Sequence, residues 1–239
     1  MLTTFISLDL LFLIPEIFLI FSIIIILIYS IFISTKYTLL NNKKYNTPII
    51  TTIITNLIIF TSFILIILYS QNLTNFQILF NGQFIISYYT QIGKIFIFGI
   101  TILCLLTFNS YLKNNQINNY EYLILILISI LSICLLLNTN DLLHYYIIIE
   151  LQSLCFYTIT ALKKNNIYSS EAGLKYFILG SIISGLLLLG IALLYGMTGL
   201  TNLKELSIFL LTTTSNKLII FSFILILNIQ NVNPHFFER

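Results

Sequence analysis

The sequence predicts an all-α bundle of membrane-spanning helices. Hydrophobic residues make up 58% of its 239 residues and charged residues only 8%, and the mean hydropathy is +1.00. A soluble domain of ordinary composition carries about 25% charged residues, so that class is excluded. The apolar stretches are long and do not alternate with polar residues. This excludes the roughly 10-residue alternating strands of a membrane β-barrel and leaves helices.

Seven apolar stretches form the spans of one predicted membrane domain, since a crossing takes about 20 helical residues. Pro15 and Glu16 interrupt the first stretch, and the last is short for a complete crossing. The spacing of leucines over residues 203–214 predicts a short helix on the membrane surface, with an irregular loop as the alternative. In chain order the spans cover residues 8–33, 49–69, 85–108, 122–137, 141–162, 172–196 and 217–229.

Basic residues outside the spans predict the orientation of the chain. One side carries seven of them, and the other carries Lys94, Lys204 and Lys217. Positively charged residues favour the inner side of a membrane, so the N-terminus is predicted to face outward. The basic residues form no cluster of the kind that binds nucleic acid. The seven are Lys36, Lys43, Lys44, Lys113, Lys163, Lys164 and Arg239.

The fifth span carries a carboxylate deep in its apolar region. Glu150 follows Asp141 by nine residues, which is about 13 Å along a helix and near the middle of a bilayer. An ionised group at this depth costs about 2.5 kcal/mol or more to insert, which predicts a role in a proton pathway. The alternative is a protonated carboxyl that hydrogen bonds to a neighbouring helix and has no transport role.

Three more ionisable residues are candidates beside this carboxylate. Lys175, in the sixth span, lies nearer the membrane surface, and its flexible side chain can reach the head groups. Glu171 precedes it by four residues, so these two can instead form a purely structural ion pair. His144 lies close to the predicted interface, where a histidine serves either as a proton carrier or as an anchoring polar group.

A carboxyl and a cation inside a membrane are sufficient for a charge-coupled proton switch. Removal from water favours the neutral form of a carboxyl, and an approaching cation favours the ionised form. Protonation or movement of a lysine can therefore load and unload Glu150. Helix rise separates Glu150 from Lys175 by about 10 Å, so a bridging water or a third residue is expected between them.

No metal or cofactor site is predicted in this chain. Cys104, Cys134 and Cys155 lie within spans and lack metal-ligand spacing, and no phosphate-binding loop or Ser/His/Asp grouping occurs. The N-terminal region has the features of neither a secretory signal nor an import signal, so insertion at the site of synthesis is expected. The abundance of Ile, Leu, Asn, Phe and Tyr favours an AT-rich organellar genome, with a divergent bacterium as the alternative.

Four stretches resemble a known family. They are ELQSLCFY at 150–157, SSEAGLKYFILGSIISG at 169–185, LLYGMTGLTNL at 193–203 and FLIPEIFLI at 12–20. Together they are similar to subunit 2 of mitochondrial NADH:ubiquinone oxidoreductase, respiratory complex I. The resemblance implies an antiporter-like, proton-translocating subunit of the mitochondrial inner membrane, with its N-terminus toward the intermembrane space.

The resemblance also assigns residues and partners. It implies that Glu150 and Lys175 translocate protons. His144, Glu171 and Asn228 are further candidates for accessory roles beside them. NADH, FMN, iron–sulfur clusters and ubiquinone are then bound by other subunits of the complex, which are the expected partners together with lipids. Two competing functions are a subunit of a cation/proton antiporter and a non-catalytic membrane assembly protein.

The C-terminal end departs from the pattern of the family. Members have a lysine followed by a stretch like Val-Pro-Phe-His, where this chain reads LNIQNVNPHFFER, so Asn228 takes the place of the lysine. Pro234 disfavours helix at Asn233, as expected for an interrupted helix. Members continue well beyond a seventh helix. The chain is therefore expected to be the N-terminal portion of a split subunit, with the remainder in another polypeptide.

Overall fold

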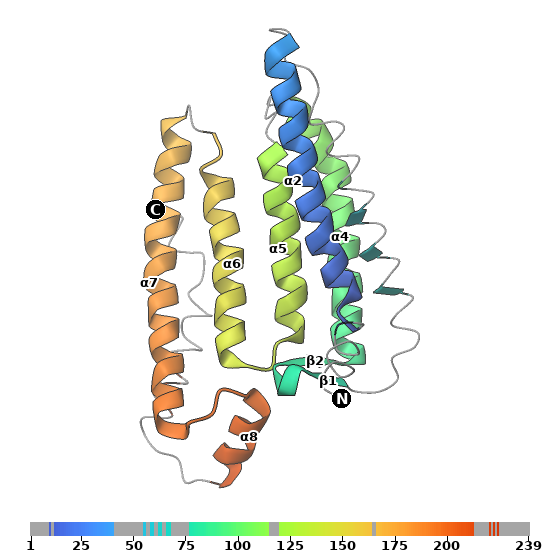
Figure 1. The fold of residues 1–239 in the computed structure, drawn as a ribbon. Coiled ribbons are helices and arrows are strands. Elements are labelled where there is room, and N and C mark those ends of the chain that lie inside the picture. Colours follow the sequence, from blue (N-terminus) through green and yellow to red (C-terminus); the bar gives the residue numbers. More distant parts are fainter. Residues whose placement is uncertain are drawn as a thin grey trace. The chain divides into compact units, whose positions relative to one another are not determined.

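The computed structural model is mainly helical (Figure 1). Its elements are α2 (Ile14–Leu40), β1 (Gln77–Leu79), the 3-10 turn η1 (Phe80–Gly82), β2 (Phe84–Ile86), α4 (Tyr88–Asn114), α5 (Tyr120–Asn138), α6 (Leu142–Thr160), α7 (Ile167–Thr198) and α8 (Leu203–Thr212). The residues described are 10, 12–40, 55, 58–59, 62–63, 66–67, 77–114, 120–163, 166–212, 220, 222 and 224.

Five of the described helices are long and apolar enough to cross a membrane. They confirm the predicted class of an all-α membrane bundle. The spans expected at 49–69 and 217–229 lie largely outside the described residues, although the few residues described in each are helical. The five crossing segments are Ile14–Phe32, Tyr88–Leu105, Glu121–Asn138, Leu142–Thr160 and Ile167–Thr198.

The interruption expected at Pro15 and Glu16 lies just before them, because the helical residues Leu10 and Phe12 are followed by a turn at Leu13. α2 begins at Ile14 and continues to Leu40, so Pro15 stands in its first turn. A proline is tolerated there because the first N–H groups of a helix have no intrahelical partner. Glu16, also in the first turn, places its negative charge at the positive end of the helix dipole.

A short hairpin occupies the start of the span that was expected from residue 85. β1 pairs with β2, and the turn between them has positive φ at Phe80, Asn81 and Gly82. Asn-Gly is a strong hairpin signal because both residues tolerate positive φ. The sequence NGQF at 81–84 carries that signal, and α4 consequently begins only at Tyr88.

The contacts of the chain fall into two compact units. The first comprises 1–81 and 85–138, and the second comprises 82–84 and 139–239. In the first unit α5 packs against both α2 and α4, and in the second α6 packs along α7. The core of the first unit is built from buried apolar side chains that include Leu19, Ile26, Ile59, Phe98, Leu123 and Leu127.

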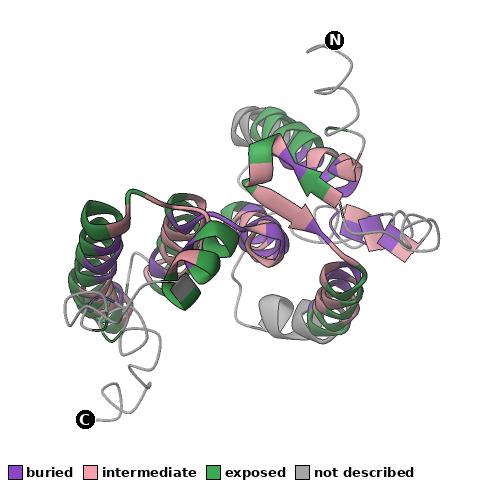
Figure 2. Ribbon diagram, turned by 90° about the horizontal axis from the view of Figure 1, so that it is seen from below, coloured by how far each residue is buried: buried purple, intermediate pink, exposed green. Residues whose placement is uncertain are grey.

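The helix α7 begins five residues before the expected start at residue 172. Asn166 caps it, because its side-chain oxygen accepts a hydrogen bond from the Tyr168 N–H at 3.1 Å. The helix ends at Thr198, and Gly199 follows with a φ of 68° in the left-handed conformation that closes many helices. Much of its apolar surface is exposed (Figure 2), as lipid or a neighbouring subunit would require.

Small residues allow α6 and α7 to approach closely. A Cβ added at Gly173 would lie 2.7 Å from the Cβ of Ala161. One added at Gly180 would lie 1.7 Å from the hydroxyl oxygen of Tyr157. These contacts fix the register of the two antiparallel helices and leave no room for a larger side chain at either glycine.

Candidate functional site

Glu150 lies in the middle of α6, on the face that packs against α7. Tyr146, four residues before it, packs on the apolar core that contains Leu187 of α7. Tyr157, seven residues after it, lies against Gly180 of α7. Positions four and seven residues apart share a helix face, so Glu150 is directed toward the contact between these helices.

One carboxylate oxygen of Glu150 lacks a donor. Its Oε2 atom is inaccessible to solvent and has no hydrogen bond partner among the described residues. A buried polar atom without a partner is costly. A water molecule that donates to this oxygen would satisfy it. The position is therefore suited to a carboxyl in contact with internal water.

Lys175 pairs with Glu171 rather than with Glu150. Its Nζ atom lies 2.6 Å from Glu171 Oε1, and the two side chains are 70% and 53% exposed. The local ion pair left open by the sequence is thus present. Ala161, at the end of α6, and Gly173 of α7 lie opposite each other. Glu150 lies eleven residues from Ala161 along α6, and Lys175 lies two residues from Gly173 in the same direction along the antiparallel α7. The difference of nine residues is about 13 Å along the helices, in line with the expected separation.

His144 is held at the start of α6 by Asp141. Its Nδ1 atom lies 3.0 Å from Asp141 Oδ2, and its ring meets the edge of Phe84 at a centroid distance of 5.6 Å. The other oxygen of Asp141 is buried without a hydrogen bond partner in the described part of the chain. His144 is therefore an anchored polar group, and it lies six residues, about 9 Å along the helix, from Glu150.

Two asparagines fix the backbone next to this histidine. Asn140 donates from Nδ2 to the carbonyl of Gly82 and to Asn202 Oδ1, both at 2.8 Å. Asn202 donates in turn to the same carbonyl at 3.1 Å. Leu203, the first residue of α8, donates its N–H to the carbonyl of Asn140 at 2.9 Å. The network ties the start of α6 to the start of α8 and so positions Asp141 and His144.

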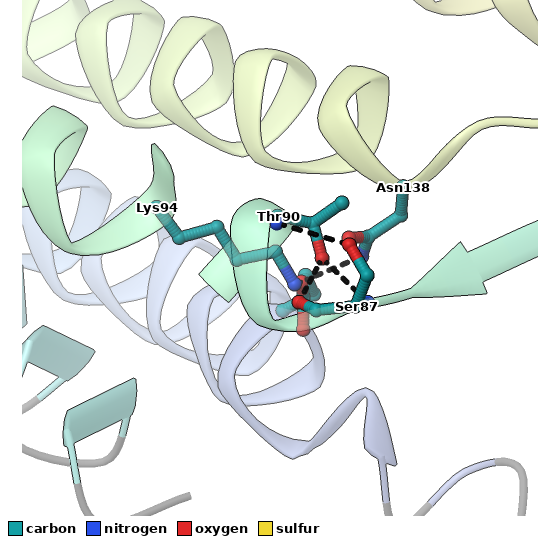
Figure 3. A network of polar contacts seen from close by, with 5 residues as sticks. Ser87, Thr90, Lys94 and Asn138 are labelled. Carbon is teal, nitrogen blue, oxygen red and sulfur yellow. Dashed lines mark hydrogen bonds and ion pairs between the residues drawn. The ribbon is translucent and has the colours of Figure 1, made fainter. Parts of the chain in front are cut away.

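A second charged site, which the sequence reasoning missed, lies between α2, α4 and α5 (Figure 3). The ammonium of Lys94 forms an ion pair with Glu16 Oε1, and Asn138 Nδ2 donates to the same oxygen at 3.2 Å. The side chains of Lys94 and Glu16 are 1% and 3% exposed.

The prediction that Lys94 is one of the exposed basic residues that set the orientation of the chain is wrong. Lys94 lies within α4 and is buried, which leaves Lys204 and Lys217 as the basic residues on that side. Glu16 and Lys94 each lie inside an apolar span, one in α2 and the other in α4. A charged residue in such a span is the sequence signal that indicates a buried site. The accessory candidate Asn228 lies outside the described residues.

Comparison with known proteins identifies the family. Residues 139–229 match the family described as NADH:quinone oxidoreductase/Mrp antiporter, transmembrane. The chain is 40% identical over 201 residues to NADH-ubiquinone oxidoreductase chain 2 of Marchantia polymorpha. Residues 139–229 of the chain therefore belong to this antiporter-like family. The match to the Marchantia protein covers 83% of this chain and 40% of that relative.

Other members of the antiporter-like family agree with this assignment. The chain is 35% identical over 193 residues to NADH-quinone oxidoreductase subunit N of Pelagibacter ubique, which covers 80% of this chain and 38% of the relative. It therefore spans about two fifths of the length of these two relatives. The matched family segment contains Glu150 and Lys175 but neither Glu16 nor Lys94.

Two solved structures share the fold of the antiporter-like chain. The membrane-bound sulfane sulfur reductase, an archaeal respiratory membrane complex, gives a TM-score of 0.68 at 21% identity, covering 91% of this chain and 43% of that one. Respiratory complex I from Thermus thermophilus with bound Aureothin gives 0.57 at 20% identity, covering 87% and 43%. At these identities the likeness shows the fold alone.

Proposed function

We propose that the chain is a membrane subunit of a proton-translocating NADH:quinone oxidoreductase. The observation that carries the proposal is the 40% identity over 201 residues to NADH-ubiquinone oxidoreductase chain 2. The chain spans only part of that relative, so the activity belongs to the assembled complex. In the proposal, quinone reduction elsewhere in the complex drives protons through the membrane part to which this chain contributes.

Glu150 is the proposed proton-carrying residue of the matched segment. Its position in the middle of α6, its orientation toward α7 and its Oε2 atom, which has no donor within the described part of the chain, support that role. A proton from the aqueous phase adds to the carboxylate and neutralises its charge. A cation that approaches then favours the ionised form, and the proton leaves.

Lys175 is the proposed source of the variable charge. Opening the exposed pair with Glu171 would free its ammonium, and such a pair contributes only about 0–1 kcal/mol. The ammonium is too far along the helix to contact Glu150 directly, so water or a third residue must connect them. His144, held by Asp141, is the proposed accessory group at the other end of α6, and Asn228 is proposed as a further one.

The proposed cellular setting is the mitochondrial inner membrane, with the N-terminus toward the intermembrane space. The excess of basic residues on the opposite face supports this orientation, and burial of Lys94 strengthens the excess.

Other subunits of the proposed complex bind NADH, FMN, the iron–sulfur clusters and ubiquinone. A separate polypeptide is proposed to supply the rest of the relatives' length, and peptide mapping of the purified complex tests this point.

A subunit of a cation/proton antiporter is the second candidate function. The description of the matching family favours it, since that description names Mrp antiporters together with NADH:quinone oxidoreductases. The two candidates share the fold and the proton-carrying carboxyl. They differ in whether redox subunits accompany the chain.

Purification of the native particle separates these candidates. The chain is isolated with its partners in mild detergent, and NADH:quinone reductase activity is measured on the same particle. The proposed function predicts that the activity and the flavin of redox subunits co-purify with the chain. A particle without them that exchanges cations for protons in vesicles would establish the second candidate instead.

A further inference from the structure

The buried pair of Glu16 and Lys94 is surrounded by acceptors that lack donors. Glu16 Oε2 and Asn138 Oδ1 are inaccessible and have no hydrogen bond partner among the described residues. The same holds for Oε1 of Gln91, which is 2% exposed and lies on α4 one turn before Lys94. All three are oxygens, so the site needs donors rather than acceptors.

Internal water meets this need. A buried water makes about three hydrogen bonds and normally serves buried polar groups that would otherwise be unsatisfied. The ammonium of Lys94 has three N–H groups, and Glu16 accepts from one of them. Water can accept from the others and donate to the carboxylate and the amides. The site is thus built to hold water next to two ionisable groups.

A stripe of polar side chains leads from the start of α4 to this pair. Ser87, Gln91 and Lys94 are spaced by four and three residues, which places them on one face of the helix. Ser87 is half-buried and exchanges hydrogen bonds with Thr90 at 3.0 and 3.3 Å (Figure 3). The stripe covers about 10 Å of helix rise and offers protons a short route from the end of the helix.

The helix ends favour the two charges of the pair, whereas burial disfavours them. Glu16 stands at the positive end of α2, and Asn138 ends α5, where the negative end of the dipole favours the ammonium. Burial opposes this, because removing two charges from water costs free energy. Cys134, one turn before Asn138 and within reach of both charges, is a further titratable side chain beside the pair.

We propose that Glu16, Lys94, Gln91 and Asn138 form a second proton-exchange site, separate from Glu150. A proton moves from the Lys94 ammonium through water to the Glu16 carboxylate, which leaves an amine and a carboxylic acid without changing the total charge. A proton arriving along the stripe then restores the ammonium, and Glu16 later releases its own. A contribution of this site to pumping rests on the proposed function, whereas proton exchange at Glu16 does not.

The protonated form of Glu16 is measured directly with a membrane-permeable carbodiimide, which adds to protonated carboxyl groups, followed by peptide mass spectrometry of the intact complex. Modification of Glu16 should rise as the pH falls. Lys94→Met should increase it several-fold at a given pH, because the cation that favours the ionised form is gone. Gln91→Leu, which keeps both charges and interrupts the stripe, should decrease it several-fold. Ser132→Ala, a buried uncharged change on α5, is the control and should leave it unchanged.

Glu150 in the same samples separates the two proposals. Modification of Glu150 without modification of Glu16 at any pH would overturn the second site and leave the proposed function intact. Modification of Glu16 without modification of Glu150 would support the second site and contradict the proton-carrying role proposed for Glu150. A double variant, Glu16→Gln with Lys94→Met, tests the contribution to pumping without leaving an unpaired charge. It should assemble yet move fewer protons per electron, and an unchanged ratio would reduce the pair to a structural role.

Discussion

Glu16 and Lys94, 78 residues apart in the sequence, form an almost completely buried ion pair between α2 and α4. Loss of one partner leaves an uncompensated charge, which costs about 3–5 kcal/mol, whereas loss of both does not. Glu16→Gln and Lys94→Met alone should therefore lower the thermal stability of the purified complex. The double variant should recover most of it. Equal losses in the single and double variants would contradict a coupled pair.

Gly180→Ala should separate α6 from α7. The added methyl group would overlap the ring of Tyr157, whose Cζ atom lies only 2.5 Å from the position of the new Cβ. We expect lower amounts of assembled complex on native gels. Gly185→Ala on the same helix is the matched control, because nothing lies within 4 Å of its added Cβ. Similar behaviour of the two variants would contradict the observed register.

Gly82→Ala should destabilise the contact between the turn at Gly82 and Asn202 in the second unit. Gly82 has a φ of 90°, which costs other residues about 1–3 kcal/mol, and its added Cβ would lie 2.9 Å from Asn202 Nδ2. Limited proteolysis should cut the variant more readily in the segment before α8. Gly196→Ala, with open space around the added Cβ, should behave like the unmodified protein.

Lys175→Met should change proton pumping more than stability. The pair with Glu171 is exposed, and such pairs contribute about 0–1 kcal/mol. Assembly and melting temperature should therefore stay close to those of the unmodified complex while pumping decreases. The matched control is Lys163→Met, an exposed lysine in the connection before α7. Normal pumping in Lys175→Met would leave its pair with Glu171 as a purely structural contact.

The sequence predicted those features that depend on local patterns. Apolar length marks the spans, and a spacing of four residues marks the pair of Glu171 and Lys175. The helix α7 starts earlier than predicted because its first turn, IYSSE, is polar and resembles a loop, while Asn166 supplies the cap. The hairpin also has a local signal, Asn81-Gly82, because both residues tolerate positive φ.

The pair of Glu16 and Lys94 depends on tertiary structure. Its members belong to different helices, and Asn138, the third, comes from α5. Hydropathy gives the depth of each charge along its own helix but not which helices are neighbours. The sequence alone therefore predicts an exposed Lys94 and gives Glu16 no partner. A charge inside an apolar span was the one signal that pointed to a buried partner.

Glu150→Gln is the sharpest test of the role of Glu150 as a proton carrier. The change preserves the shape of the side chain and removes its titratable proton. The intact complex is reconstituted in vesicles, and the protons moved per electron passed to quinone are measured. Thr158→Val, an exposed change on the same helix, is the control. We predict that Glu150→Gln assembles normally but moves far fewer protons per electron, and an unchanged ratio would contradict the account.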